Sequence, residues 1–187
     1  KIGSVNTLVS RSGKIYGYNT DAPGFLRAIG GFEQINSALV LGAGGTARAV
    51  AYALKSRSVR VCVLNRSEGR LANFAEFEKF SCANFAEFKC GKFDLVINTT
   101  SAGLKDENLP APIEILRPLF AKAKFAFDVI YGKKTPFLNL AAASGLACKD
   151  GSEMLLFQAV KALNLFFEDS LDEAKIEASM RKALALR

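Results

Sequence analysis

The feature that restricts the fold most is a glycine cluster, Gly42 to Gly45, between an apolar run and a helical pattern. The preceding run, Ala38 to Leu41, is continuously apolar, as is typical of a strand buried on both faces of a parallel sheet. After the glycines, apolar residues recur at the spacing of one helix face, namely Ala47, Val50, Ala51 and Leu54. Val59 to Leu64 has the pattern of the next strand. Residues 36–64 therefore predict a strand–turn–helix–strand unit with the length of a βαβ crossover.

Each glycine of this turn has a chemical reason in a dinucleotide-binding fold. The first permits the tight turn, the second lets the backbone approach a diphosphate, and the small Ala47 lets helix and strand pack closely. The helix N-terminus then offers free amides and a positive dipole end to the phosphates. An isolated glycine cluster could equally be a helix-capping turn, but its place inside a βαβ unit favours the cofactor. The predicted contacts are Gly42, Ala43, Gly44, Gly45 and Thr46.

Strands and helices continue to alternate along the chain. Phe93–Asn98 and Phe125–Val129 have strand patterns, and helices are expected over Phe137–Ala143, Ser152–Phe167 and about Leu171–Leu186. The fold class predicted is α/β, a Rossmann-type doubly wound parallel sheet, preceded by a β-hairpin segment and ending in helices. A near-repeat of residues 72–77 at 83–88 carries no functional weight, because two copies are too few for a solenoid.

The segment after the second strand indicates which dinucleotide is bound. An NAD-binding domain usually places an acidic residue here to hold the ribose 2′-hydroxyl. This chain instead has Asn65, Arg66 and Ser67, with Arg70 close behind. Guanidinium groups pair with a 2′-phosphate, which a carboxylate would repel. The position favours NADP, and the alternative is a solvated basic turn.

A polar cluster is predicted at the end of the N-terminal hairpin. Residues 5–9 and 15–19 flank a turn at Ser12-Gly13 and predict two antiparallel strands. That register places Asn6 near residue 19, and hence close to Asp21. Such a cluster can bind a polyhydroxylated molecule, although helix capping and Asx-turns explain isolated Asn and Asp residues equally well.

Composition narrows the chemistry and the partners. The 187 residues contain no histidine, so acid–base work falls to Asp, Glu, Lys, Tyr or Cys, and a Cys/His metal site is excluded; we expect no metal. The four cysteines form no CxxC pair, which favours reduced thiols in a cytoplasmic protein. The net charge of +7 is scattered, which fits an anionic small molecule better than nucleic acid. No apolar run is long enough to span a bilayer, so no membrane partner is expected.

Seven motifs occur in the order found in shikimate dehydrogenases, and the chain resembles that family up to about residue 160. They are Asn6-Thr7-Leu8; Asn19-Thr20-Asp21 with Gly24-Phe25; Gly42-Ala43-Gly44-Gly45 with Ala47-Arg48; Asn65-Arg66-Ser67 with Arg70; Ile97-Asn98-Thr99-Thr100-Ser101-Ala102-Gly103; Asp128-Val129-Ile130-Tyr131 with Thr135-Pro136-Phe137-Leu138; and Asp150-Gly151 with Met154-Leu155 and Gln158-Ala159.

The resemblance implies reduction of 3-dehydroshikimate to shikimate with NADPH, in the pathway to aromatic amino acids. Carried over by motif, the substrate residues are Asn6, Asp21, Tyr131 and Gln158, with Asp21 also catalytic. The cofactor residues are Gly42, Ala43, Gly44, Gly45, Thr46, Asn65, Arg66, Ser67, Arg70, Val129 and Gly151. Packing for Tyr131 and a polar helix face for Gln158 remain the structural alternatives.

The resemblance also implies a division of the chain. Residues 1–24 are expected to be a hairpin and linker from a substrate domain, 25–151 the NADP-binding Rossmann domain, and 152–187 helices that bridge back to the substrate domain. If the last helix packs on that domain, the apolar face of Ile176, Met180 and Leu184 would be exposed here and could drive self-association. The expected state is a monomer or a homodimer.

One departure from the family pattern concerns catalysis. The family's Ser-rich substrate loop and its lysine in an Asn-Val-Thr-x-Pro-x-Lys motif do not occur in these 187 residues. We therefore expect a piece of a longer enzyme without its N-terminal substrate domain, able to bind NADP but slow to reduce dehydroshikimate. Asp21 would be the partner of that lysine, which supplies the proton that ketone reduction requires. The alternatives are a quinate/shikimate dehydrogenase that uses NAD and a non-catalytic NADP-binding module.

Overall fold

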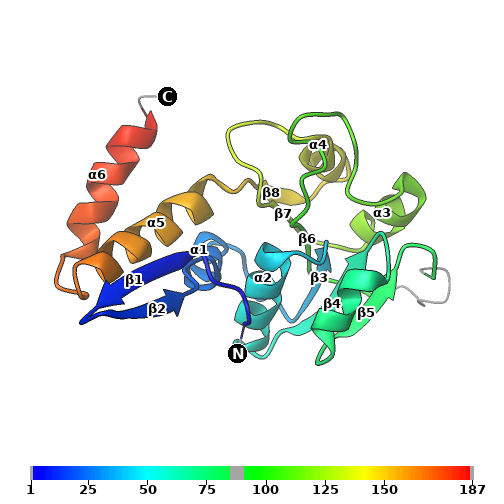
Figure 1. Ribbon diagram of the computed structural model, residues 1–187. Helices are drawn as coiled ribbons and strands as arrows, with labels where there is room; N and C mark the ends of the chain where they lie inside the picture. The colour runs from blue at the N-terminus through cyan, green and yellow to red at the C-terminus, as the bar shows by residue number, and fades with distance from the viewer. Residues whose placement is uncertain (1, 85–90, 186–187) are drawn as a thin grey trace.

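A parallel sheet of six strands forms the centre of the computed structural model, which describes residues 2–84 and 91–185 (Figure 1). Its strands lie in the order β5-β4-β3-β6-β7-β8, the order found in Rossmann-type dinucleotide-binding sheets. Their bounds are β3 Ser37–Leu41, β4 Arg60–Asn65, β5 Glu78–Ser81, β6 Leu95–Asn98, β7 Phe125–Asp128 and β8 Ala147–Lys149. The chain order reverses between β3 and β6, and ligands of open α/β sheets bind outside the carboxyl ends of strands at such a point. The predicted fold class is confirmed.

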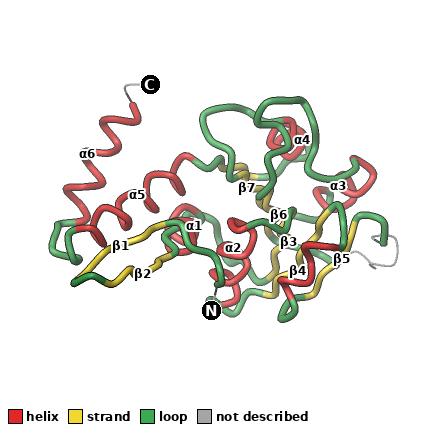
Figure 2. The backbone as a smooth tube through the Cα atoms, viewed as in Figure 1, coloured by secondary structure: helices red, strands yellow, loops and turns green. Residues whose placement is uncertain are grey.

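Helices cover both faces of this sheet (Figure 2). On one face lie α1 Asp21–Ala28, α2 Gly45–Lys55 and α5 Ser152–Phe166, packed on residues such as Val40. On the other lie α3 Ile113–Phe120 and α4 Pro136–Ala143, packed on residues such as Leu39. Adjacent residues of β3 thus enter different cores, which explains why the strand is apolar without alternation. In the described part of the chain, no helix combines the length and apolar character needed to cross a membrane.

A two-stranded hairpin precedes the sheet. β1 Thr7–Arg11 pairs antiparallel with β2 Lys14–Tyr18 through the turn residues Ser12 and Gly13, both at positive φ. Two such residues are typical of the tight turn that matches strand twist. The hairpin contacts α5, where the Arg11 guanidinium donates a hydrogen bond of 3.0 Å to the carbonyl oxygen of Leu165. The hairpin and its turn are confirmed, with the first strand two residues later and the second one residue earlier than predicted.

The structure differs from the sequence prediction in several regions, and the edge strands β5 and β8 were not predicted. Helix α1, for which the sequence analysis gave no range, begins at Asp21, and Pro23 lies in its first turn, where a missing amide is tolerated. The expected border at residue 24 therefore falls inside a helix. Helix α3 was not predicted, and it contains Pro118, a residue that disfavours the interior of a helix. The first copy of the near-repeat overlaps a 3₁₀ helix, η1 Gly69–Phe74, and residues 85–90 lie outside the described part.

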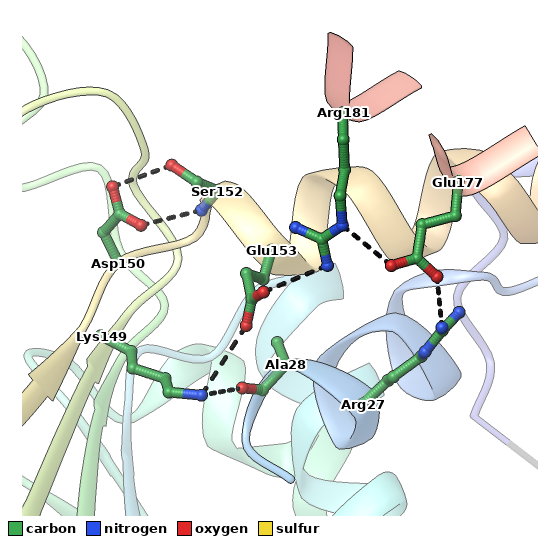
Figure 3. Close-up of polar contacts among 8 residues, drawn as sticks. All are labelled: Arg27, Ala28, Lys149, Asp150, Ser152, Glu153, Glu177 and Arg181. Carbon is green, nitrogen blue, oxygen red and sulfur yellow. Dashed lines mark hydrogen bonds and ion pairs between the residues drawn. The ribbon is translucent and has the colours of Figure 1, made fainter. Parts of the chain in front are cut away.

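The expectation of an exposed apolar face on the last helix is wrong. Helix α6 Glu173–Ala185 lies along α5, and Ile176, Met180 and Leu184 pack against the core that α1 and α5 share. Charged groups hold the same contact at its rim (Figure 3). Glu177 forms ion pairs with Arg27 of α1 and with Arg181 of its own helix. Arg181 also forms an ion pair of 3.3 Å with Glu153 of α5. The three apolar side chains are thus partly buried against the chain's own helices rather than exposed.

The turn after β3 generates a stability prediction. Gly42 has φ +108°, and a Cβ there would lie 2.7 Å from Thr99 Oγ1 and 2.9 Å from Thr100 Cγ2. We expect Gly42→Ala to lower the free energy of unfolding by about 2–5 kcal/mol, from backbone strain and overlap together. Thermal denaturation should show a melting temperature roughly 5–15 °C lower. Gly44→Ala is the control, because no atom lies within 4 Å of its added Cβ. An equal loss in both variants would contradict this explanation.

Candidate functional site

A cleft of about 940 Å³ opens at the carboxyl edge of the sheet, beside the strand-order reversal. Six of the predicted cofactor residues line it, namely Gly42, Ala43, Gly44, Asn65, Arg66 and Arg70. They lie at or just after the ends of two neighbouring strands. Because Leu41 at the end of β3 pairs with Leu64 of β4, both strands deliver these residues to the same edge of the sheet. We call this the larger cleft. Gly45 and Ser67, also predicted, are not among the lining residues.

The glycine turn forms the floor of the larger cleft and leads into α2. The Gly42 amide donates a hydrogen bond of 2.8 Å to the carbonyl oxygen of Leu64, which holds the turn against the neighbouring strand. Gly44 is the N-cap of α2 and supplies no side-chain cap, so the first amides of the helix are left for another acceptor. A Cβ on Gly44 would meet no protein atom within 4 Å. The turn therefore has the free amides and the open space that a diphosphate group requires.

The two arginines supply positive charge at the other wall of the larger cleft. Arg66 and Arg70 are exposed, and neither forms an ion pair with an acidic residue in the described ranges. The Asn65 amide holds the turn between them by donating a hydrogen bond of 2.8 Å to the carbonyl oxygen of Ser67. Burial raises the pKa of the nearby Cys82 thiol, and the charge of Arg66 opposes this increase. The arginines can therefore bind an anionic group without breaking an ion pair of the described chain.

The third wall of the larger cleft was not among the predicted site residues. It consists of the residues that follow β6, namely Thr99, Thr100, Ser101 and Ala102. The Thr99 hydroxyl donates a hydrogen bond of 2.7 Å to the carbonyl oxygen of Leu41, which fastens this loop to the end of β3. The sequence position of these polar residues could have predicted their role, since they directly follow β6, the strand on the other side of the point where the strand order reverses.

A smaller cleft of about 340 Å³ brings together all four residues predicted to bind substrate. They come from the hairpin, α1, the loop after β7 and α5, and are Asn6, Asp21, Tyr131 and Gln158. Three predicted cofactor residues, Thr46, Val129 and Gly151, line this cleft rather than the larger one. The start of α2 thus contributes to both clefts, with Gly44 in one and Thr46 in the other.

Hydrogen bonds order the polar side of the smaller cleft. The Asn6 amide donates to a carboxylate oxygen of Asp21 at 2.8 Å, and its own oxygen accepts from the Thr20 backbone amide at 2.9 Å. The Thr20 hydroxyl donates to Gln158 Oε1 at 3.2 Å. Close packing of α1 on α5 makes this possible, because a Cβ on Gly24 would lie 2.8 Å from the Gln158 backbone nitrogen. The hairpin register predicted the proximity of Asn6 to Asp21, and the structure confirms it.

Asp21 is half-buried at the N-terminus of α1. Burial raises the pKa of its carboxyl group above the ordinary value, and the hydrogen bond from Asn6 opposes part of that increase. No basic residue of the described ranges forms an ion pair with Asp21, so within them only polar groups balance its charge. A carboxyl group placed this way in a cleft is typical of functional rather than purely structural sites.

The loop after β7 closes the smaller cleft against α5. A Cβ on Gly151 would lie 2.1 Å from the carbonyl oxygen of Val129, so only glycine permits this approach. Asp150 accepts a hydrogen bond from the Gly132 amide at 3.3 Å. It also accepts from both the amide and the hydroxyl of Ser152, as Figure 3 shows. Tyr131 is 49% exposed at the rim. Its ring is thus available to a bound molecule.

Comparisons with known proteins agree with this architecture. The family model for shikimate / quinate 5-dehydrogenase matches residues 28–105. A shikimate dehydrogenase (NADP+) from Helicobacter hepaticus is 44% identical over 179 residues, covering 94% of this chain. One from Thermus thermophilus is 38% identical over 190 residues, covering 100% of this chain and 70% of that protein. The crystal structure of the Thermus thermophilus enzyme in complex with NADP(H) and shikimate has a TM-score of 0.76 and 34% identity, covering 97% of this chain and 69% of that one.

The extent of these matches defines what they establish. This chain spans 66% of the length of the Helicobacter hepaticus protein. The similarity runs through the hairpin, the sheet and the C-terminal helices, with identity well above the level at which only a fold is shared. By this identity and coverage, the chain belongs to the shikimate dehydrogenase family.

Proposed function

We propose that this chain is the cofactor-binding part of an NADP-dependent shikimate dehydrogenase, which reduces 3-dehydroshikimate to shikimate. The observation that carries the proposal is the meeting of two clefts at the start of α2. One cleft has a glycine turn and two exposed arginines, and the other has the Asn6, Asp21 and Gln158 cluster. A ketone reductase must hold a dinucleotide and a polyhydroxylated substrate side by side, as this arrangement allows.

The residues of the larger cleft fit NADP. The amides at the start of α2 suit the diphosphate, and Gly44 leaves room for its approach. Arg66 and Arg70 suit the 2′-phosphate, with Asn65 and Ser67 holding the turn that carries them. When bound, NADPH supplies the hydride. Thr46, Val129 and Gly151 are proposed to lie next to its nicotinamide end, because they line the cleft proposed for the substrate.

The residues of the smaller cleft fit a polyhydroxylated acid. Amide groups of Asn6 and Gln158 can exchange hydrogen bonds with hydroxyls, and the Asp21 carboxylate can accept one. Tyr131 offers both a ring face and a hydroxyl at the rim. We propose that Asp21 also orients the cationic group that delivers the proton, since the alkoxide formed by hydride addition must be protonated.

Three further assignments accompany this proposal. We infer that residues 25–151 are the NADP-binding domain, that 1–24 belong with a substrate domain, and that 152–187 bridge back to it, with α1 spanning the first border. The supporting observation is that the smaller cleft draws residues from all three ranges.

A cytoplasmic location is proposed because Cys82 and Cys148 are free thiols rather than disulfides. The proposed state is a monomer or a homodimer, without nucleic-acid or membrane partners.

Replacing Arg66 tests the choice of cofactor. We expect Arg66→Ala to weaken NADP+ binding by about 10- to 100-fold, the effect of losing charge-assisted hydrogen bonds. NAD+ binding should be unchanged, because that cofactor has no 2′-phosphate. Isothermal titration calorimetry of the chain with each dinucleotide measures both. Arg57→Ala is the control, since Arg57 is exposed and lines neither cleft. Equal loss for both dinucleotides, or tighter binding of NAD+ by the unaltered chain, would favour an NAD enzyme instead.

Replacing Asp21 tests the catalytic proposal. We expect Asp21→Asn to lower kcat for shikimate oxidation in the whole enzyme by about 100-fold or more. Its folded state should be no less stable at pH 7. The pKa of Asp21 is higher in the folded state than in the unfolded state, so the folded state favours the protonated carboxyl group. The wild type therefore loses stability relative to the variant as the pH increases from the unfolded-state pKa of Asp21 through its folded-state pKa.

The assay for this prediction is NADPH absorbance, with chemical denaturation at several pH values for stability. Glu33→Gln serves as the matched control, because it removes an exposed carboxylate outside both clefts. Unchanged turnover in Asp21→Asn would refute its catalytic role. Absence of turnover in the unaltered whole enzyme, with NADP+ binding retained, would favour a non-catalytic NADP-binding module.

A further inference from the structure

A buried carboxylate at the end of β7 lines neither cleft. Asp128 is 0% exposed and accepts four hydrogen bonds. The Asn98 amide nitrogen lies 3.1 Å from each carboxylate oxygen, the Thr135 hydroxyl donates at 2.6 Å, and the Ile130 backbone amide donates at 3.0 Å. The carboxylate is therefore engaged with the protein itself rather than directed at a cleft.

Asn98 continues this hydrogen-bond chain into the larger cleft. It ends β6, is 0% exposed, and is the register partner of Asp128 on the neighbouring strand. Its side-chain oxygen accepts the backbone amide of Thr100 at 2.9 Å and the Thr100 hydroxyl at 2.8 Å. Thr100 lines the larger cleft, whereas Ile130 stands between two residues of the smaller cleft, Val129 and Tyr131. One uninterrupted set of hydrogen bonds thus joins a wall of each cleft.

Stability alone does not account for a carboxylate at this place. Among the described residues no cation forms an ion pair with Asp128, and the nearby Asp150 has the same charge. Burial raises the pKa of Asp128, opposed by the hydrogen bonds from Thr135, Ile130 and Asn98. Burying a carboxylate without a paired cation costs free energy even when hydrogen bonds offset part of it. A satisfied polar network instead defines one geometry, because an unpaired member in a low-dielectric interior is strongly unfavourable.

We propose that Asn98 and Asp128 are positioning residues for the reaction, which set the loop of the larger cleft relative to the loop of the smaller cleft. The proposal rests on the proposed function, in which these clefts hold NADP and the substrate. Neither residue lines a cleft, so both act through Thr100, Ile130 and the α4 cap residue Thr135.

This role affects turnover more than binding. Most binding residues keep their places when the pair is altered, since Arg66 and Arg70 of the larger cleft and Asn6, Asp21 and Gln158 of the smaller cleft belong to other elements. The distance and angle between the two bound molecules, however, depend on how the loops are joined. A displacement of about 1 Å from a change far from the chemistry can lower the rate of reaction by about 100-fold. The expected signature is a decrease in kcat with little change in KM.

Exchanging the two side chains gives a direct test. In Asn98→Asp two carboxylates face each other, and we expect kcat of the whole enzyme to fall by about 100-fold, with KM for both substrates within about threefold. Asp128→Asn keeps the shape but changes the donor pattern, and should lower kcat by about tenfold. The double variant, which combines both substitutions, restores an amide–carboxylate pair with the carboxylate on β6 and the amide on β7. Its turnover should return to within about threefold of the unaltered enzyme.

Asp94→Asn is the matched control. Asp94 is a buried carboxylate of the same sheet, directly before β6 and so at the opposite edge, where it accepts the backbone amides of Asn36 and Ser37. Replacing Asp94 should lower the melting temperature, and kcat should be unchanged at temperatures below the melting transition of the variant. The proposal is overturned if folded Asp128→Asn keeps full kcat, if the exchanged pair folds without restoring turnover, or if Asp94→Asn lowers kcat equally. A lack of turnover in the unaltered enzyme would instead refute the proposed function.

Discussion

The parallel pairing of β3 with β4 on one side and β6 on the other is the interaction on which the described sites depend. Leu41 is the register partner of both Leu64 and Asn98, so the three strands end at the same level. Parallel strands deliver the residues that follow them to one edge, which is why Gly42 and Thr99 lie in one cleft. The pairing is held by nearly complete burial of β3, and burial on both faces is what makes its register specific. A shift of the β3 register by one residue would turn each of its side chains toward the opposite core.

The second requirement is close approach of helices and loops around this edge, and glycine supplies it at two positions. Gly24 allows α1 to touch the backbone of α5 at Gln158, and Gly151 allows the start of α5 to touch Val129. Both contacts join segments far apart in the sequence and both border the smaller cleft. Polar side chains that would otherwise be separate thereby converge, and α6 covers the outer side of the same α1–α5 pair through Ile176.

Local patterns predicted the fold well, while tertiary contacts decided what was missed. The unit around the glycine turn was predicted because its periodicity and its turn chemistry agree, and the family comparison confirms the fold class. The hairpin register was enough to bring Asn6 to Asp21. Helix α3 was missed because packing on the sheet overrides the break that Pro118 normally causes. The loop from Thr99 was missed because its role arises from strand order, which no single segment reveals. The functional roles of the site residues stay predictions.

The carboxylates of the sheet show how physical environment separates structure from function. At the amino edge, burial alone would raise the pKa of Asp94, but backbone amides and Lys124 outweigh it and lower the pKa below the ordinary value. That carboxylate is stabilised where it lies. At the other edge, Asp128 is buried without a cation among the described residues and its pKa is raised, and the pKa of Asp21 in the adjoining cleft is raised for the same reason. Groups held at an energetic disadvantage tend to gather where geometry or chemistry requires them. Asp106, which lines the larger cleft, instead has a lowered pKa because the backbone amides of Gly103 and Asn108 donate to it. The contrast with Asp94 is therefore specific to Asp128 and Asp21, whose burial is not offset in this way.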